Sequence, residues 1–275
     1  MMHEPIYLPF LHGPAKVAPQ LRPIPLENWL PPERGTADWI GEKRRLIRDR
    51  YSDVIAHLDG ADAASLEAAH YVWCHLEGTD PASRAIDGFS LETVSQHVSD
   101  DLCVMVPKGE GFYLGSASLC APTYWSLREN IGKPLGGLHS PVPGGDPELA
   151  SRINRVFSGL KPDTILERFN WTVQLGSEKF TPSSEPFKAR LKSLSDEEAA
   201  SDLYLRVERQ TIRKLPETGA VLFTIRILVD ALPPILDKPA YRQAFAASWN
   251  RTASDLASYK GWPQYEPAIR FLLDV

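Results

Sequence analysis

The sequence predicts an α+β fold, in which helices surround a mainly antiparallel sheet within a single domain of residues 1–275. Two runs with strand character, 203–215 and 220–229, flank the turn residues 216–219 and predict a long antiparallel hairpin at the centre of the sheet. Segments with helical periodicity precede and follow this hairpin. No linker, composition break or internal repeat divides the chain, whose 275 residues are enough for one large core.

The first 32 residues predict an N-terminal strap. Eight prolines fall within residues 1–32, which leaves no room for a helix of normal length and favours extended backbone. Large apolar side chains recur along this segment, so we expect it to pack on the surface of the domain. They are Leu8, Phe10, Leu21, Leu26 and Trp29.

Three helices are predicted between the strap and the first hairpin. Apolar side chains recur at helical intervals through residues 38–57, which predicts an amphipathic helix that Gly60 can end. A second helix is predicted at 65–76, with Ser65 as its cap, and a short third helix at 91–98.

Strands and turns dominate the middle of the chain. Apolar runs at 102–106 and 112–119 flank residues that are typical of a hairpin turn. A loop rich in glycine and proline follows and leads into a helix at 147–160. The remaining elements are a strand at 165–175, a helix at 195–202 with Ser195 as cap, and helices at 239–258 and 265–273.

Composition excludes several classes of function. The chain has 30 Lys and Arg residues and 35 Asp and Glu residues, and its basic residues form no block. A nucleic-acid partner is therefore not expected. Cys74, Cys103 and Cys120 are widely spaced and form no CxxC motif, which argues against disulfides, iron–sulfur clusters and structural zinc. Prolines interrupt the N-terminus where a signal peptide needs an apolar run, and no membrane span is predicted. We therefore expect a cytoplasmic protein.

Common catalytic and nucleotide-binding signatures are missing from the chain. It has no GxGxxG after a strand, no GxxxxGK[ST], no GxSxG, no HExxH and no CxxCH. If the protein carries out redox chemistry, its electrons must come from another protein.

His139 is the histidine with the most distinctive setting. It lies in GGLHSPVPG, where glycines and prolines hold it in an extended loop. A neutral imidazole held in this way can ligate a metal or haem iron. From the spacing alone, the better interpretation is a histidine that only satisfies loop carbonyls.

The central hairpin carries charged side chains in its interior. Alternation places Arg206 and Glu208 on one face of its first strand and Arg209 on the other. Charge in the middle of a sheet is costly unless it is paired, so we expect Glu208 to meet Arg206 or Arg226. One interpretation is a structural ion pair, and the other is a site that binds an anionic cofactor edge and a cationic substrate.

The segment ERFNW places Arg168, Asn170 and Trp171 on a single strand. Tryptophan in such a position most often belongs to the core, whereas the arginine and the asparagine need partners if they are buried.

Four segments together resemble the haem-dependent oxidative N-demethylase family. They are SDDLCVM at 99–105, LHSPVPG at 138–144, RFNW at 168–171 and LRVERQTIRKLPETGAVLFTIR at 205–226. The order of the remaining features agrees, with a proline-rich N-terminus, a helix bearing Lys43, and YKG at 259–261 before the last helix.

The resemblance implies a PAS-like haem-binding subunit. Such proteins oxidise dimethylamine to methylamine and formaldehyde with dioxygen, and flavin and iron–sulfur partner subunits deliver the electrons from NADPH. It implies haem b, with His139 as iron ligand, Arg206, Arg209 and Arg226 as propionate partners, and Glu208 holding the alkylammonium group. We group Arg168, Asn170 and Trp171 with the cofactor-binding residues. Glu208 and Arg206 are the predicted catalytic residues.

Two alternatives remain open at the level of the sequence. One is a haem-binding sensor or carrier without turnover, and the other is an interaction module without haem. The segment after Cys120 departs from the family pattern, because Tyr124, Trp125 and Ser126 stand near the place where relatives have a Ser-Trp pair.

Overall fold

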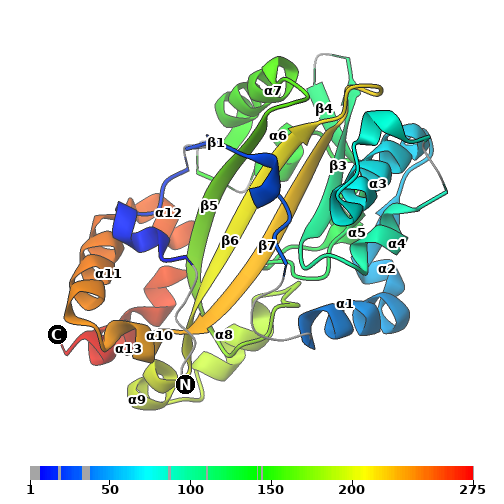
Figure 1. The fold of residues 1–275 in the computed structure, drawn as a ribbon. Helices are drawn as coiled ribbons and strands as arrows, with labels where there is room; N and C mark the ends of the chain where they lie inside the picture. Colours follow the sequence, from blue (N-terminus) through cyan, green and yellow to red (C-terminus); the bar gives the residue numbers. More distant parts are fainter. Residues whose placement is uncertain are drawn as a thin grey trace.

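A computed structural model describes residues 7–17, 20–32, 38–85, 88–109, 111–140, 142–143 and 145–274. Only the backbone is described for residues 139, 145 and 146. The predicted α+β architecture is confirmed, with helices arranged around one antiparallel sheet (Figure 1). No helix within these ranges is both long and apolar enough to cross a membrane.

Seven strands of the described chain form the sheet, in the order β1-β5-β6-β7-β3-β4-β2. Their bounds are β1 Arg22–Ile24, β2 Ile55–His57, β3 Asp101–Lys108, β4 Gly111–Ser118, β5 Ile165–Leu175, β6 Leu203–Lys214 and β7 Val221–Ala231. The predicted central hairpin is β6–β7, paired from Tyr204↔Ala231 to Lys214↔Val221. The predicted hairpin β3–β4 and the strand β5 are also present at the expected residues.

A buried carboxylate holds the turn of the central hairpin. The side chain of Glu67, on α3, accepts hydrogen bonds from the backbone N–H groups of Glu217 and Thr218 and from the Thr218 hydroxyl, at 2.6 to 3.0 Å. Gly219 closes the turn with φ at +68°, a conformation that glycine adopts without steric cost. A contact distant in sequence therefore fixes the end of the hairpin.

The pleat divides the central side chains between two faces. Cross-strand pairing puts Asn170 opposite Glu208, and Arg209 opposite Arg226. We call the face that carries Glu208 the polar face, and the face that carries Arg209 the packed face. Two large apolar clusters cover the packed face, one contributed by α11 and α13 and the other by α3 and α4.

Helices form in the segments where the sequence predicts them, and short helices also form within 121–140, where a loop was predicted. Their bounds are α1 Asp38–Asp49, α2 Tyr51–Val54, α3 Asp62–Glu77, α4 Leu91–Ser95, α5 Leu127–Asn130, α6 Leu135–His139, α7 Ala150–Gly159, α8 Glu185–Leu191, α9 Asp196–Ser201, α10 Leu232–Leu236, α11 Pro239–Arg251, α12 Ser254–Tyr259 and α13 Glu266–Leu273. Ser195 caps α9 as predicted, in a full capping box with Glu198.

Two predicted helices are wrong in their continuity. The first breaks at Arg50, and its end becomes β2, which pairs with Ser116–Ser118 of β4. The helix predicted at 239–258 breaks at Thr252, whose hydroxyl donates to Ser248 O and accepts from Ala15 N. Tertiary partners override the helical pattern at both breaks. The prediction of Ser65 as a helix cap is also wrong, because α3 begins earlier, at Asp62.

The described part of the N-terminal segment lies against the sheet and α11. Its backbone forms short 3₁₀ turns at Pro9–His12 and Leu26–Asn28, and Arg22–Ile24 pairs with β5. Phe10 is 1% exposed and contacts the rings of Trp171 and Phe245. Ser248 Oγ donates to Phe10 O at 2.6 Å. Figure 1 shows this blue segment passing from α11 across the sheet.

Candidate functional site

Glu208 occupies the middle of β6 and yet remains partly exposed. Its Oε1 accepts a hydrogen bond from Thr123 Oγ1 at 2.6 Å. Its Oε2 accepts from Gln210 Nε2 at 2.8 Å and from Asn170 Nδ2 at 3.2 Å. An ionised carboxylate offers about four acceptor positions, so with respect to the described residues one position on Oε1 remains for another donor.

Glu208 is ionised at neutral pH. Burial by itself would raise the pKa of this carboxyl, but hydrogen bonds from Thr123 and Asn170 and the charges of Arg206 and Lys260 outweigh burial and lower its pKa. A partly exposed, ionised carboxylate in the middle of a sheet can bind a small cation.

Arg206 is fully buried and bound entirely by protein acceptors. Its guanidinium donates to Thr123 Oγ1 at 2.8 Å and to Gln174 Oε1 at 3.0 Å. It also donates to backbone carbonyls of residues 121, 122, 178 and 179. Burial lowers its pKa to about 10. Arg206 and Glu208 therefore meet through Thr123, which replaces the expected direct ion pair.

A buried charge network holds the loop that carries Thr123. The Asp101 carboxylate accepts hydrogen bonds from the N–H groups of Cys120 and Ala121, each at 2.8 Å. Burial raises the pKa of Asp101, and the ammonium of Lys43 lies 3.9 Å from its carboxylate. Lys43 itself is fully buried. The SDDLC segment therefore positions the loop next to Glu208.

Arg168 and Lys260 bring positive charge to the polar face beside Glu208. Arg168 Nε is buried and has no hydrogen-bond partner among the described residues, and burial lowers the pKa of this guanidinium. Lys260 Nζ donates to Asn170 Oδ1 at 2.7 Å and to Trp171 O at 2.9 Å. Burial lowers the pKa of Lys260 to about 8.

Apolar side chains that are only partly buried surround these polar groups. Leu166, Phe223 and Ile225 come from the sheet, and Trp125 and Leu138 come from the 121–140 region. Ile225 contacts both apolar clusters of the polar face, one containing Phe157 and the other Trp39, so it lies between them. The middle of this face therefore combines apolar surface, the carboxylate of Glu208 and a guanidinium whose Nε has no hydrogen-bond partner among the described residues.

The other expected site residues are on the packed face. Arg209 is 1% exposed and donates to Glu167 Oε1 at 2.6 Å, and Arg226 donates to Asp100 Oδ2. Each arginine thus pairs with its own buried acid. These acids offset the repulsion between two cations that lie directly opposite each other on neighbouring strands. Trp171 belongs to the apolar cluster under α11. Arg226 cannot pair with Glu208, because the two side chains lie on opposite faces.

The extended loop predicted around His139 is wrong, because His139 ends the short helix α6. Its side chain is outside the described residues. Its neighbour Leu138 packs on the apolar cluster of the polar face. The backbone of α6 therefore lies on the same side of the sheet as Glu208.

Thr123, Gln210 and Lys260 were not among the site residues predicted from the sequence. Gln210 could have been found, because it shares the face of Glu208 by alternation. Lys260 lies in the YKG segment at 259–261, which signalled the family but gave this lysine no role, and no local pattern marks Thr123. Only the tertiary structure brings them to Glu208.

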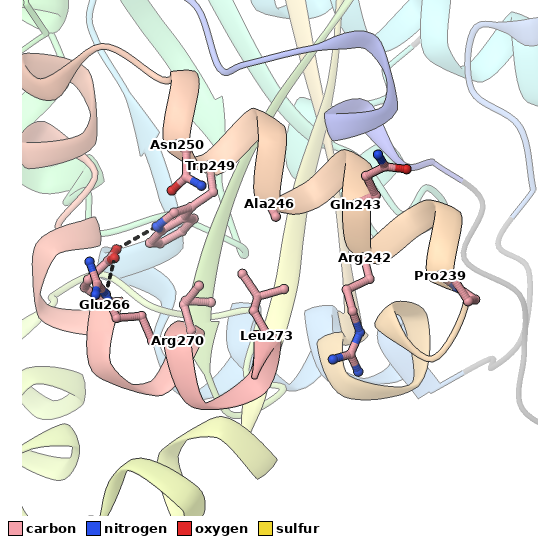
Figure 2. A pocket seen from close by; sticks show the side chains of 10 residues that line it. Pro239, Arg242, Gln243, Ala246, Trp249, Asn250, Glu266, Arg270 and Leu273 are labelled. Carbon is pink, nitrogen blue, oxygen red and sulfur yellow. Dashed lines mark hydrogen bonds and ion pairs between the residues drawn. The ribbon is translucent and has the colours of Figure 1, made fainter. Parts of the chain in front are cut away.

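A separate cavity of about 400 Å³ lies between α11 and α13 (Figure 2). Arg242 and Arg270 line it, and each is paired with an acid, Asp274 and Glu266 respectively. Trp249 Nε1 also donates to Glu266, at 2.7 Å. Because these helices cover the packed face, the cavity is on the opposite side of the sheet from the carboxylate site.

Comparison with known protein families gives one match that covers most of the chain. Residues 78–270 match the family described as haem-dependent oxidative N-demethylase, alpha subunit-like. The matched region includes the strands β3 to β7 and Thr123, Asn170 and Gln210, which donate hydrogen bonds to Glu208.

Proposed function

Because the chain belongs to the haem-dependent oxidative N-demethylase, alpha subunit-like family, we propose that it binds haem b on the polar face and oxidises a small secondary amine. Dimethylamine is the simplest such substrate. The observation that carries the proposal is the ionised, partly exposed Glu208, held by three hydrogen bonds with one acceptor position left.

The residues of the polar face fit a haem group. A haem needs apolar surface for its macrocycle and donors for its propionates, and this face offers partly exposed Leu138, Phe223 and Ile225 together with the unpartnered Nε of Arg168. We assign Arg168 to a propionate, and His139, which follows Leu138, to the iron. When bound, the haem supplies the dioxygen chemistry.

The protein's own residues bind and orient the amine. Glu208 accepts an N–H of the alkylammonium ion on Oε1, while Asn170, Gln210 and Thr123 keep the carboxylate in place. One turnover converts dimethylamine, dioxygen, two electrons and two protons into methylamine, formaldehyde and water. The electrons come from a reductase with flavin and iron–sulfur centres that draws on NADPH.

Four other residues that the sequence predicted for the site have different roles in this proposal. Arg206, bound by six protein acceptors, acts by holding Thr123. Arg209, Arg226 and Trp171 lie on the packed face, so we leave them out of the cofactor site. The three buried free cysteines suit a reducing compartment, which agrees with a cytoplasmic location.

Haem binding is tested first. Purified protein mixed with haem is expected to develop a Soret band, and His139→Ala is expected to change the spectrum of the iron. No Soret band in the wild type would overturn the proposal, and an unchanged spectrum in the variant would remove His139 as the ligand.

Turnover is tested with the loaded protein, a reductant and dimethylamine, with formaldehyde as the measured product. Glu208→Gln is expected to keep the Soret band and raise KM for the amine by about 30-fold or more, because removing one partner of a charge pair that ligand binding buries costs roughly 2–5 kcal/mol. Glu197→Gln, at an exposed site, is the matched control. Haem binding without amine oxidation by the wild type would favour a sensor or carrier.

A further inference from the structure

Lys260 reaches the polar face from outside the sheet. β1 pairs only with Ile165–Glu167 of β5, so beyond this point the outer edge of β5 has no strand partner in the described part of the chain. The segment after α12 lies along that edge, where Lys260 Nζ donates to Trp171 O at 2.9 Å. Trp262 Nε1 donates to Thr172 Oγ1 at 3.0 Å. These two contacts attach the segment to β5.

Lys260 also begins a chain of hydrogen bonds that ends at Glu208. Its Nζ donates to Asn170 Oδ1 at 2.7 Å, and Asn170 Nδ2 donates to Glu208 Oε2 at 3.2 Å. A protonated lysine can only donate and an ionised carboxylate can only accept. The asparagine amide between them therefore has a single allowed orientation, with its oxygen toward the lysine.

The orientation of this amide matters for the carboxylate. If the amide of Asn170 turned over, its oxygen would face Oε2 of Glu208, and two acceptors would repel each other. Glu208 would then lose one of its three donors, and its carboxylate would turn. The acceptor position left on Oε1 depends on the carboxylate staying where it is.

We propose that Lys260 is a positioning residue for the amine site: it fixes the amide of Asn170, and thereby keeps the free acceptor position of Glu208 available to an alkylammonium N–H. The identity of the amine ligand rests on the proposed function. The effect of Lys260 on Asn170 rests only on the described hydrogen bonds.

Electrostatics alone predicts the opposite effect on binding. Lys260 and Arg168 are cations close to Glu208, and both oppose the approach of an ammonium ion. Removing the charge of Lys260 would therefore tighten amine binding if charge were its main contribution. The sign of the change in Kd separates positioning from simple repulsion.

The first measurement needs neither haem nor amine. The side-chain amide ¹⁵N signal of Asn170 is identified in the labelled full chain by its loss in Asn170→Asp. In Lys260→Met we expect this signal to shift and broaden, and in Lys260→Arg to stay close to the wild type. Lys192→Met, at an exposed position, is the control for loss of a lysine. An unchanged signal in Lys260→Met overturns the proposal.

The second measurement is the Kd of dimethylammonium for the haem-loaded protein, determined by calorimetry. We expect Lys260→Met to weaken binding by about tenfold. Lys260→Arg and Lys192→Met are expected to bind the amine about as tightly as the wild type. Unchanged or tighter binding in Lys260→Met overturns the positioning role. A wild type that binds no amine contradicts the proposed function, and the Asn170 signal then still decides the contact on its own.

The wild type offers a test that does not depend on the folding of a variant. The charged groups that face Lys260 are Glu208 on β6 and Arg168 on β5, and burial lowers the pKa of this lysine to about 8. A neutral lysine can accept as well as donate, so the amide orientation is no longer unique above this pH. We expect amine binding to weaken between pH 7 and 9.5 in the wild type and not in Lys260→Arg. Equal pH dependence in both proteins contradicts the inference.

Discussion

At the scale of single residues, the informative feature is a carboxylate that the fold keeps charged in the middle of a sheet. Burial disfavours the ionised form of Glu208, and three hydrogen bonds together with nearby cations favour it more strongly. Sequence alternation placed Glu208 on the correct face but suggested the wrong partner. A neutral donor, Thr123, occupies the position expected for an arginine.

The lowered pKa of Glu208 predicts how the stability of the protein depends on pH. Its folded pKa lies below the ordinary value of 4.5, so the stabilisation is fully present above that value and is lost as the pH falls through the folded pKa. Glu208→Gln is therefore expected to be less stable than the wild type near pH 7, with a difference that shrinks toward pH 3. Urea unfolding at several pH values measures it. A difference that does not vary with pH would contradict an ionised, stabilising Glu208.

At the scale of elements, the site depends on how β6 is tied to its neighbouring loops. Arg206 on β6 donates to backbone carbonyls in two separate loops, at 121–122 and at 178–179. It also donates to Thr123, which in turn donates to Glu208. One buried side chain therefore sets the distance between a strand and the loop that completes the site.

Arg206→Met tests this connection. The variant leaves several buried carbonyls without a donor, and hydrogen bonds to charged groups are each worth about 1.5–3 kcal/mol. We expect a loss of at least about 3 kcal/mol in the free energy of unfolding, measured by urea denaturation. Arg152→Met, at an exposed position, is the control and should change stability by less than about 0.5 kcal/mol. A loss below about 1 kcal/mol in Arg206→Met would show that the loops are held by other contacts.

The capping box of α9 is an element that the sequence predicted in detail. Ser195 Oγ accepts from the backbone N–H of Glu198, and the Glu198 carboxylate accepts from the N–H of Ser195. Ser195→Ala is expected to cost about 1 kcal/mol of unfolding free energy, as measured by urea denaturation. Ser193→Ala, just before the helix, is the control, and an equal effect of the two changes would argue against the cap.

At the scale of the whole molecule, the N-terminal segment joins parts of the chain that are far apart in sequence. Phe10 packs on Trp171 of β5 and Phe245 of α11, and Trp29 O accepts from Arg209 on β6 at 2.9 Å. The segment therefore contributes to the core that supports the packed face of the sheet.

Phe10→Ala tests that contribution. Truncating a buried phenylalanine typically costs about 3–5 kcal/mol, so we expect a loss of that order in urea denaturation and faster proteolysis near the N-terminus. Leu11→Ala, at the adjacent exposed residue, is the control. Faster proteolysis without a loss of global stability would mean that the segment detaches on its own, and no change in either measurement would contradict its place in the core.

The sequence by itself determined the sheet-forming hairpins, the strand at 165–175 and the face of each central side chain. These features depend on local alternation and turn chemistry, which neighbouring residues specify. Tertiary structure decided where two predicted helices break, because Ile55–His57 and Thr252 find partners elsewhere in the chain. It also decided which groups surround Glu208: Thr123, 85 residues away in sequence, binds it directly, and Lys260, 52 residues away, acts through Asn170. A local pattern cannot encode contacts that form only when the whole sheet is assembled.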